Sequence, residues 1–168
     1  MPSAHTIDLK LSKQSQELLD RLEKYAGFVS VLASMKVIGI SYRKEVKAIF
    51  ERKQVRKPSL KWEKLDPIYK KIKDKKYPGK GILEATGTLK ESMTVLGAFG
   101  NISKTTHKSG SFGSSVSYGD YHDNTTKPRK TLPLRNFSLP SESTYGSWLN
   151  TIESDLSAQL ERIGIVVT

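Results

Sequence analysis

Apolar residues recur at intervals of three and four along three stretches of the chain, a spacing that is typical of amphipathic helices. The first helix is expected after Ser12, which can cap a helix N-terminus, and should end near Gly27. The second is expected over residues 30–53 and the last over residues 141–163. The apolar side chains predicted to line them are Leu18, Leu19, Leu22 and Tyr25, then Val31, Met35, Ile38, Tyr42, Val46 and Ile49, and finally Tyr145, Trp148, Leu149, Ile152, Leu156, Leu160 and Ile163.

Two shorter helices are predicted by the residues that would begin and end them. Leu65-Asp66-Pro67 combines an N-cap residue with a proline suited to a first helical turn, and Tyr77-Pro78-Gly79 should end that helix. Thr88-Leu89-Lys90-Glu91 has the spacing of a capping box, which predicts a helix or turn over residues 88–96.

Alternation of apolar and polar residues predicts a small number of strands. Residues 7–11 alternate in this way, which indicates either a short first strand or an extended arm. Residues 99–120 are rich in Gly, Ser and Thr, and alternation continues over residues 116–118. We therefore expect two strands in this region, joined by a turn near Ser109-Gly110.

The order of these elements predicts an α+β fold, with helices packed on a mainly antiparallel sheet and a long C-terminal amphipathic helix. The chain has 168 residues, which fits a single domain over 1–168. Extended arms are possible at 1–11 and 165–168. In the last helix we expect Trp148, Leu149, Ile152 and Leu156 to be buried against the sheet.

Positive charge is concentrated in one part of the sequence. The formal net charge is +11, and residues 43–80 alone hold 15 Lys and Arg against 5 acids, a net of +10. Such a segment attracts phosphate, acidic protein or anionic lipid, although it can also be only a solvated face. The residues expected to face a partner or DNA are Arg43, Lys44, Lys47, Arg52, Lys53, Arg56, Lys57, Lys70 and Lys71.

Three aromatic residues, Trp62, Tyr69 and Tyr77, lie among these basic residues and could stack on bases. Large aromatic side chains usually bury most of their area, so we favour a core position for Trp62, and the same alternative exists for Tyr69.

The sequence contains no pattern typical of an enzyme. It lacks cysteine, which excludes disulfides and thiolate metal sites. Asp120, His122 and Asp123 could form a metal or general-base cluster, but no second cluster supplies further ligands. Lys80 lies between two glycines without the spacing of a phosphate-binding loop. We expect no catalytic residue, cofactor or metal, and, without a visible signal peptide or membrane span, a soluble protein that is not exported.

Several short motifs occur in a fixed order between residues 62 and 137. Trp62 and Leu65 are followed by Lys73, then by Ile82-Leu83-Glu84-Ala85-Thr86-Gly87-Thr88-Leu89-Lys90-Glu91-Ser92-Met93, Phe112-Gly113-Ser114, Tyr118-Gly119-Asp120-Tyr121-His122 and Pro133-Leu134-Arg135-Asn136-Phe137. This order resembles the phage virion-morphogenesis, or tail-completion, family of Mu-like phages, over about residues 40–163. Gly119 replaces an alanine of the family pattern, and Asp123-Asn124-Thr125 replaces its Gln-x-Gly.

The resemblance implies a structural protein of the virion neck that joins head and tail or completes the tail. It implies that Gly87 permits a tight turn, Leu89 packs and Arg135 fixes a loop. The motif residues expected to be structural are Trp62, Gly87, Leu89, Tyr118, His122, Arg135 and Phe137. The expected partners are further copies in a ring (six in preference to twelve), neighbouring neck, portal-adaptor or tail-terminator proteins and possibly DNA in the channel, but no membrane. Assembly would take place in the host cytoplasm. The alternative function is sequence-independent DNA binding.

Overall fold

The computed structural model of the chain describes residues 5–9, 12–26, 30–53, 61–123, 133 and 135–164. The strands within them are β1 (His5–Leu9), β2 (Asn101–Thr105) and β3 (Gly110–Ser114). The helices are α1 (Lys13–Ala26), α2 (Leu32–Arg52), α3 (Pro67–Lys76), α4 (Thr88–Thr94), a short 3-10 helix η1 (Ser117–Gly119), α5 (Asp120–Asp123) and α6 (Glu142–Arg162). This combination of helices with an antiparallel sheet confirms the α+β fold class.

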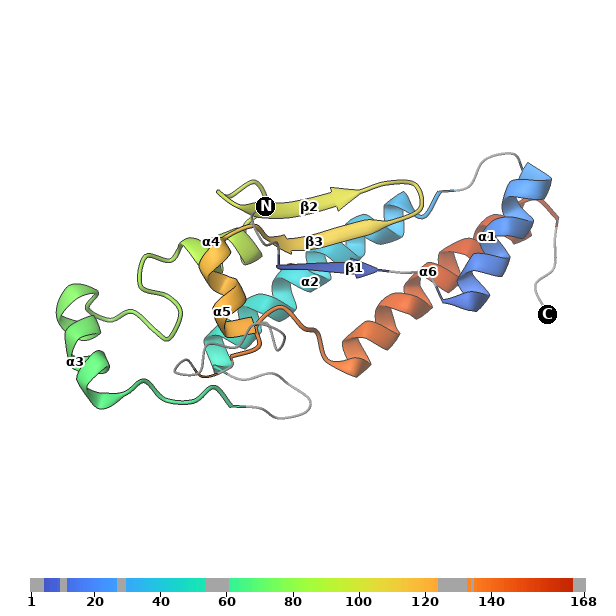
Figure 1. The fold of residues 1–168 in the computed structure, drawn as a ribbon. Helices are drawn as coiled ribbons and strands as arrows, with labels where there is room; N and C mark the ends of the chain where they lie inside the picture. Colours follow the sequence, from blue (N-terminus) through green and yellow to red (C-terminus); the bar gives the residue numbers. More distant parts are fainter. Residues whose placement is uncertain are drawn as a thin grey trace.

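The three strands form one antiparallel sheet in the order β1-β3-β2, so the last strand in sequence lies in the middle. Phe112 of β3 is paired with Ile7 on one side and Ser103 on the other. The β2–β3 turn is closed by the backbone N–H of Thr106, which donates to the carbonyl oxygen of Ser109 at 2.8 Å. The sheet lies over α2 (Figure 1).

Helix α2 forms the centre of the core because its apolar stripe is buried along almost its full length. The six residues predicted to form this stripe are each no more than 1% exposed. Gly39 lies on the same face, where a Cβ atom would come within 2.5 Å of Cε1 of Phe112. The missing side chain therefore allows the sheet to lie directly on the helix.

Helix α6 packs mainly against α1 and α2 rather than against the sheet, so the expected position of its apolar stripe is wrong. Trp148, Ile152 and Leu156 are buried there, and the indole N–H of Trp148 donates to Oγ of Ser41 at 2.9 Å. Leu149 is only half-buried, because it points away from the line that faces the two other helices. A sheet of three short strands covers only one side of α2, which leaves the other side for α6.

One helix start and one strand differ from expectation. Helix α4 is capped by Gly87 and makes no side-chain cap bond, so the predicted capping box does not form. Thr88 is instead the first helical residue, and its hydroxyl bonds to that of Thr86 at 3.0 Å. After β3 the chain turns into η1 and α5, so Val116 and Tyr118 are not in a strand.

The N-terminal alternation forms a strand over residues 5–9, which supports the first of the two readings of that segment. The rest of the possible N-terminal arm, the expected helix stop at Gly27 and the C-terminal arm at 165–168 lie outside the described residues. None of the helices within the described ranges combines the length and apolar composition needed to span a bilayer.

Replacement of Trp148, the largest of the buried side chains of α6, should lower the free energy of unfolding. Trp148→Ala removes a ring that is 3% exposed and leaves Ser41 without its donor, so we expect a loss of about 3–5 kcal/mol in the free energy of unfolding. Urea denaturation measures this loss, and Leu149→Ala, at the neighbouring half-buried position, should cost clearly less. Equal losses for both variants would contradict this packing.

Candidate functional site

Trp62 is a core residue that joins two distant segments of the chain. It is 6% exposed, and its ring meets that of Phe50 edge-on at a centroid distance of 5.4 Å. Phe50 in turn contacts Phe137 at 5.8 Å. The indole N–H of Trp62 donates to the carbonyl oxygen of Asn136 at 2.9 Å. The core interpretation of Trp62 is therefore confirmed, and its ring is not available to stack on a base.

Arg135 makes a second connection between the same two segments. Its side chain is almost fully buried, and its Nε and Nη2 atoms donate to the carbonyl oxygen of Glu63 at 3.2 and 3.0 Å. Its backbone N–H donates to the carbonyl oxygen of His122 at 2.6 Å. Burial lowers the pKa of the guanidinium, but an arginine remains charged in proteins at any physiological pH. The implied role of Arg135 in fixing a loop agrees with these bonds.

The carboxylate of Asp123 is engaged with the backbone. Its Oδ1 accepts N–H bonds from Phe137 at 2.7 Å and from Ser138 at 3.3 Å, so it holds residues 137–138 against α5. Among the residues that the structure describes, no three His, Asp or Glu side chains lie close enough together to hold a metal ion. Asp123 of the Asp-x-His-Asp cluster therefore has a structural role in this part of the chain.

His122 lies half-buried beside Arg135. Burial lowers the pKa of its imidazole and the positive charge of Arg135 lowers it further, while a hydrogen bond to the backbone of Pro133 acts in the opposite direction. Its Nδ1 atom is buried and has no hydrogen-bond partner. A neutral imidazole is therefore the favoured form in the folded chain.

His122, Pro133 and Arg135 form one wall of a cleft with a volume of about 800 Å³. The other walls come from residues 63–69 and 82–86 and from Lys73 of α3. The cleft combines apolar side chains with a few cationic and hydroxyl groups and with the carboxylates of Glu63 and Asp66. Its lining residues are Glu63, Lys64, Leu65, Asp66, Pro67, Tyr69, Lys73, Ile82, Leu83, Ala85, Thr86, Tyr118, His122, Pro133 and Arg135.

The ammonium of Lys73 anchors α3 to the loop that follows it. Lys73 is 4% exposed, and its Nζ donates to the carbonyl oxygens of Lys80 and Gly81 at 2.6 and 2.9 Å. Further along this loop Leu83 has a φ angle of +61°, which is uncommon for a residue other than glycine. Sequence reasoning gave neither residue a role, because no local pattern signals a buried lysine or a left-handed leucine.

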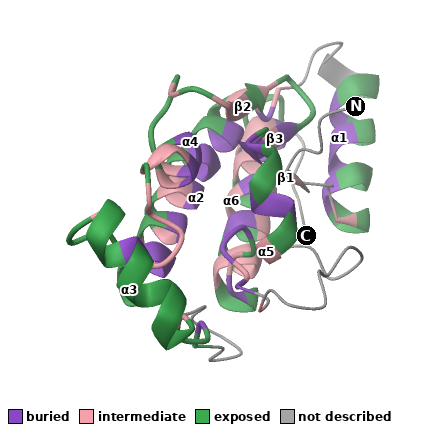
Figure 2. Ribbon diagram, turned by 60° about the vertical axis from the view of Figure 1, so that its left-hand side comes forward, coloured by how far each residue is buried: buried purple, intermediate pink, exposed green. Residues whose placement is uncertain are grey.

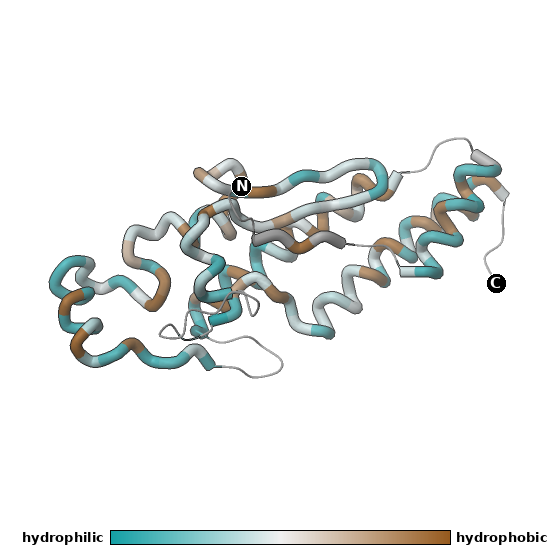
Figure 3. The backbone as a smooth tube through the Cα atoms, viewed as in Figure 1, coloured by the Kyte–Doolittle hydropathy of each residue, from teal (hydrophilic) through white to brown (hydrophobic). Residues whose placement is uncertain are grey.

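Helix α3 begins as the sequence predicts, since Oδ1 of Asp66 accepts the N–H bonds of Ile68 and Tyr69 at 2.9 and 3.0 Å. The helix stands apart from the sheet and the long helices (Figure 1), and most of it is exposed (Figure 2). Ile68, Tyr69 and Ile72 are 71%, 52% and 61% exposed, so Tyr69 is not a core residue. The helix is mainly hydrophilic, with a few hydrophobic positions among its lysines (Figure 3).

The basic residues predicted to face a partner divide into two groups. Lys44 and Lys47 of α2 and Lys70 and Lys71 of α3 are exposed, and Lys70 pairs with Asp74 one turn later. Arg43 and Lys53 are half-buried and contact Ser103 and Glu84, and Lys53 also lies over the Trp62 ring. Arg52 is exposed, but it donates to the carbonyl oxygen of Ala48 within its own helix. Arg56 and Lys57 lie outside the described residues.

The remaining residues of the family-like motifs lie in the core or at its edge. Gly87 has a φ angle of +86° and so allows the turn before α4, and Leu89 and Phe137 are fully buried. Tyr118 is 43% exposed and lines the cleft. Leu89 and Gly87 therefore occupy the positions that the resemblance implies.

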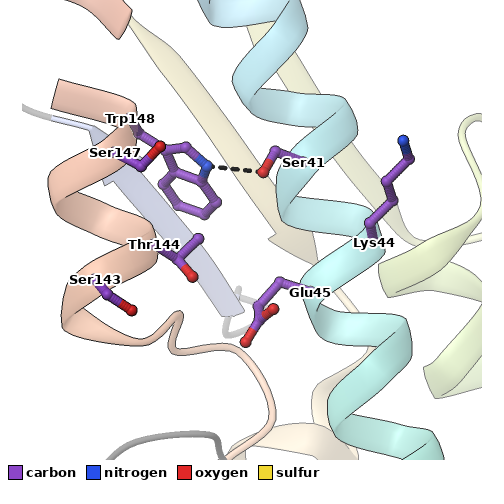
Figure 4. Close-up of a pocket in the computed structure, with 7 residues that line it drawn as sticks. All are labelled: Ser41, Lys44, Glu45, Ser143, Thr144, Ser147 and Trp148. Carbon is purple, nitrogen blue, oxygen red and sulfur yellow. Dashed lines mark hydrogen bonds between the residues drawn. The ribbon is translucent and has the colours of Figure 1, made fainter. Parts of the chain in front are cut away.

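A second, smaller hollow of about 400 Å³ lies between α2 and α6 (Figure 4). Its lining is made of hydroxyl groups together with Lys44, Glu45 and Trp148, and it contains no histidine. Ser41 accepts the Trp148 indole N–H there, so this hydroxyl serves the packing of the two helices.

Comparison of the chain with protein-family models, with curated proteins and with solved structures finds no match.

The depressed pKa of His122 makes folding sensitive to pH. The unfolded histidine takes up a proton near pH 6.5, whereas the folded one does so at lower pH, so stability is retained above about pH 6.5 and declines as the pH falls below it. His122→Gln removes this contribution. Between pH 7.5 and pH 5 we expect the free energy of unfolding of the wild type to fall relative to that of the variant. Urea denaturation at several pH values measures both. A constant difference across this range would show that His122 titrates normally.

Proposed function

We propose that the chain is a non-enzymatic structural protein of a phage virion that acts at the junction of head and tail. The observation that supports this most directly is the mutual packing of motifs that are far apart in sequence. Trp62 and Glu63 belong to the first motif, and they bind the Asn136 carbonyl and the Arg135 guanidinium of the last. Motifs whose residues hold one another in place are expected of a structural family, since no catalytic group is needed to account for them.

The mode of action proposed here is assembly into a homo-oligomeric ring that docks on neighbouring rings. Closed symmetric oligomers are the usual form of such proteins, and six copies are the expected number. The exposed apolar side chains of α3 and the exposed lysines of α2 and α3 supply surface that this chain does not cover by itself. Surface of this kind is what a docking protein needs.

The second candidate, sequence-independent DNA binding, rests on the same exposed lysines. It would need only contacts to phosphate, so its affinity should fall steeply with salt concentration. Because the aromatic ring of Trp62 is buried, base stacking would fall to Tyr69, whose ring is exposed.

The proposal predicts an assembly phenotype in the phage or prophage that encodes the chain. Without the chain, lysates should contain DNA-filled heads and separate tails, visible by electron microscopy, and addition of the purified chain should restore joined particles. Absence of the chain from purified particles, or normal particles without it, would contradict the proposal.

Charge reversal separates the two candidates. In the variants Lys44→Glu/Lys47→Glu and Lys70→Glu/Lys71→Glu, all the changed groups are exposed, so the free energy of unfolding should remain within about 0.5 kcal/mol of wild type. At least one of the two double variants should prevent the joining of heads and tails. Duplex DNA should bind the wild type only weakly in a fluorescence anisotropy titration at physiological salt. Tight DNA binding that both reversals abolish would favour the DNA-binding candidate.

A further inference from the structure

Helix α3 carries apolar side chains that the described residues leave exposed to solvent. Ile68 and Ile72 are four residues apart and Tyr69 and Ile72 three apart, so the three side chains are neighbours on one side of the helix. All three are more than half exposed. No other described element packs extensively against α3. Contiguous exposed apolar side chains on an ordered helix are typical of an interaction surface.

The charge around these apolar residues limits the kind of partner. Residues 61–80 contain eight lysines and three acids, a net charge of +5. Asp74 pairs with Lys70, whereas Glu63 and Asp66 place two carboxylates on the wall of the cleft. Even with all three acids counted, the segment keeps an excess of five positive charges. The same face of a second copy would be repelled, whereas a segment rich in carboxylates would be attracted.

The cleft continues this surface toward the body of the molecule. Tyr69 and Lys73 belong both to α3 and to the cleft wall, and Ile82 and Leu83 lie on the wall formed by the following loop. Arg135 supplies a buried positive charge on the motif side of the cleft. Lys73 ties the loop to the helix through the carbonyl groups of Lys80 and Gly81, so helix and loop are held together as one surface.

We propose that α3 and the adjoining cleft form one docking site for an acidic segment of another protein that also carries aliphatic side chains. The aliphatic groups would cover Ile68 and Ile72, and the carboxylates would meet the exposed lysines of the same helix. Duplex DNA fits less well, because its outer surface is mainly phosphate and sugar and offers little that is apolar to place on the two isoleucines. This inference rests on the proposed function for its setting, an assembly in which a neighbouring protein presents such a segment.

The isoleucines themselves provide the readout of a direct test. The full chain, labelled at isoleucine methyl groups, is titrated in NMR experiments with a synthetic peptide of Glu and Leu in a helical repeat. Matched peptides have Lys in place of Glu or Ser in place of Leu. We expect the Glu/Leu peptide to shift the methyl signals of Ile68, Ile72 and Ile82. The signals of Ile40 and Ile163, which are 50% and 44% exposed elsewhere on the molecule, should stay in place.

A pair of variants tests whether these side chains carry the binding. Ile68→Ser/Ile72→Ser should weaken the affinity for the Glu/Leu peptide about tenfold or more, because a few apolar side chains dominate most interfaces. The control, Val37→Ser/Ile40→Ser, changes an apolar pair on α2 that is also at least half exposed, and it should bind as the wild type does. Both variants should keep the urea midpoint of the wild type.

Several outcomes would overturn the proposal. These are unmoved signals of Ile68 and Ile72 at saturating peptide, equal shifts with all three peptides, or equal weakening by the two variants. Duplex DNA or anionic phosphatidylglycerol vesicles that shift the same signals more strongly than the Glu/Leu peptide would assign the surface to nucleic acid or membrane instead. Particles that join normally with Ile68→Ser/Ile72→Ser contradict this inference alone. Peptide binding by a chain that is absent from particles contradicts the proposed function alone.

Discussion

The close approach of β3 to α2 at Gly39 is the contact on which the arrangement of the whole molecule depends. The ring of Phe112 occupies the space that a side chain at Gly39 would need, and it also lies 6.0 Å from the ring of Tyr42. Because β3 is the central strand, this single contact places the sheet on the helix. Helix α4 then packs against α2 and the two strands β2 and β3, and η1 and α5 follow directly from the end of β3.

The positions of the candidate site follow from that arrangement. Helix α5 brings Asp123 and His122 to the segment that contains Arg135 and Phe137, and the end of α2 brings Phe50 to Trp62. Two backbone carbonyls, those of Glu63 and Asn136, then join the segments by charge-assisted and indole hydrogen bonds. The cleft is the space left between this junction and the loop that returns from α3.

Local patterns were sufficient to predict the long helices but not the contacts between them. Helices α1, α2, α3 and α6 have strong periodicity or clear caps, and their bounds differ from the predicted ones by only a few residues. The segment around Val116 alternates over too few residues to distinguish a strand from the helical turn that tertiary packing imposes. Charge counting likewise failed to separate Lys53 and Lys73, which are bound within the chain, from Lys70 and Lys71, because burial depends on carbonyl and carboxylate groups elsewhere in the sequence. For the same reason no pattern in the sequence predicted the cleft. The spacing of Ile68, Tyr69 and Ile72 in a lysine-rich helix was, however, a sequence signal for the exposed surface beside it.

The isolated position of α3 has a consequence for the rate at which the chain recognises other molecules. A helix of 10 residues is marginal in water without neighbours to pack against, and α3 is supported chiefly by its Asp66 cap and the Lys73 anchor. Its amide hydrogens are therefore expected to exchange with solvent through local opening, long before the core around α2 unfolds. A segment that opens and refolds in this way can meet a partner over a larger volume than a rigid helix can. If the partner binds only the helical form, however, only the fraction of molecules in which α3 is helical can bind at each encounter. The hydrogen bonds of Lys73 to the carbonyl groups of Lys80 and Gly81 would then help to set the rate at which the chain associates with a partner.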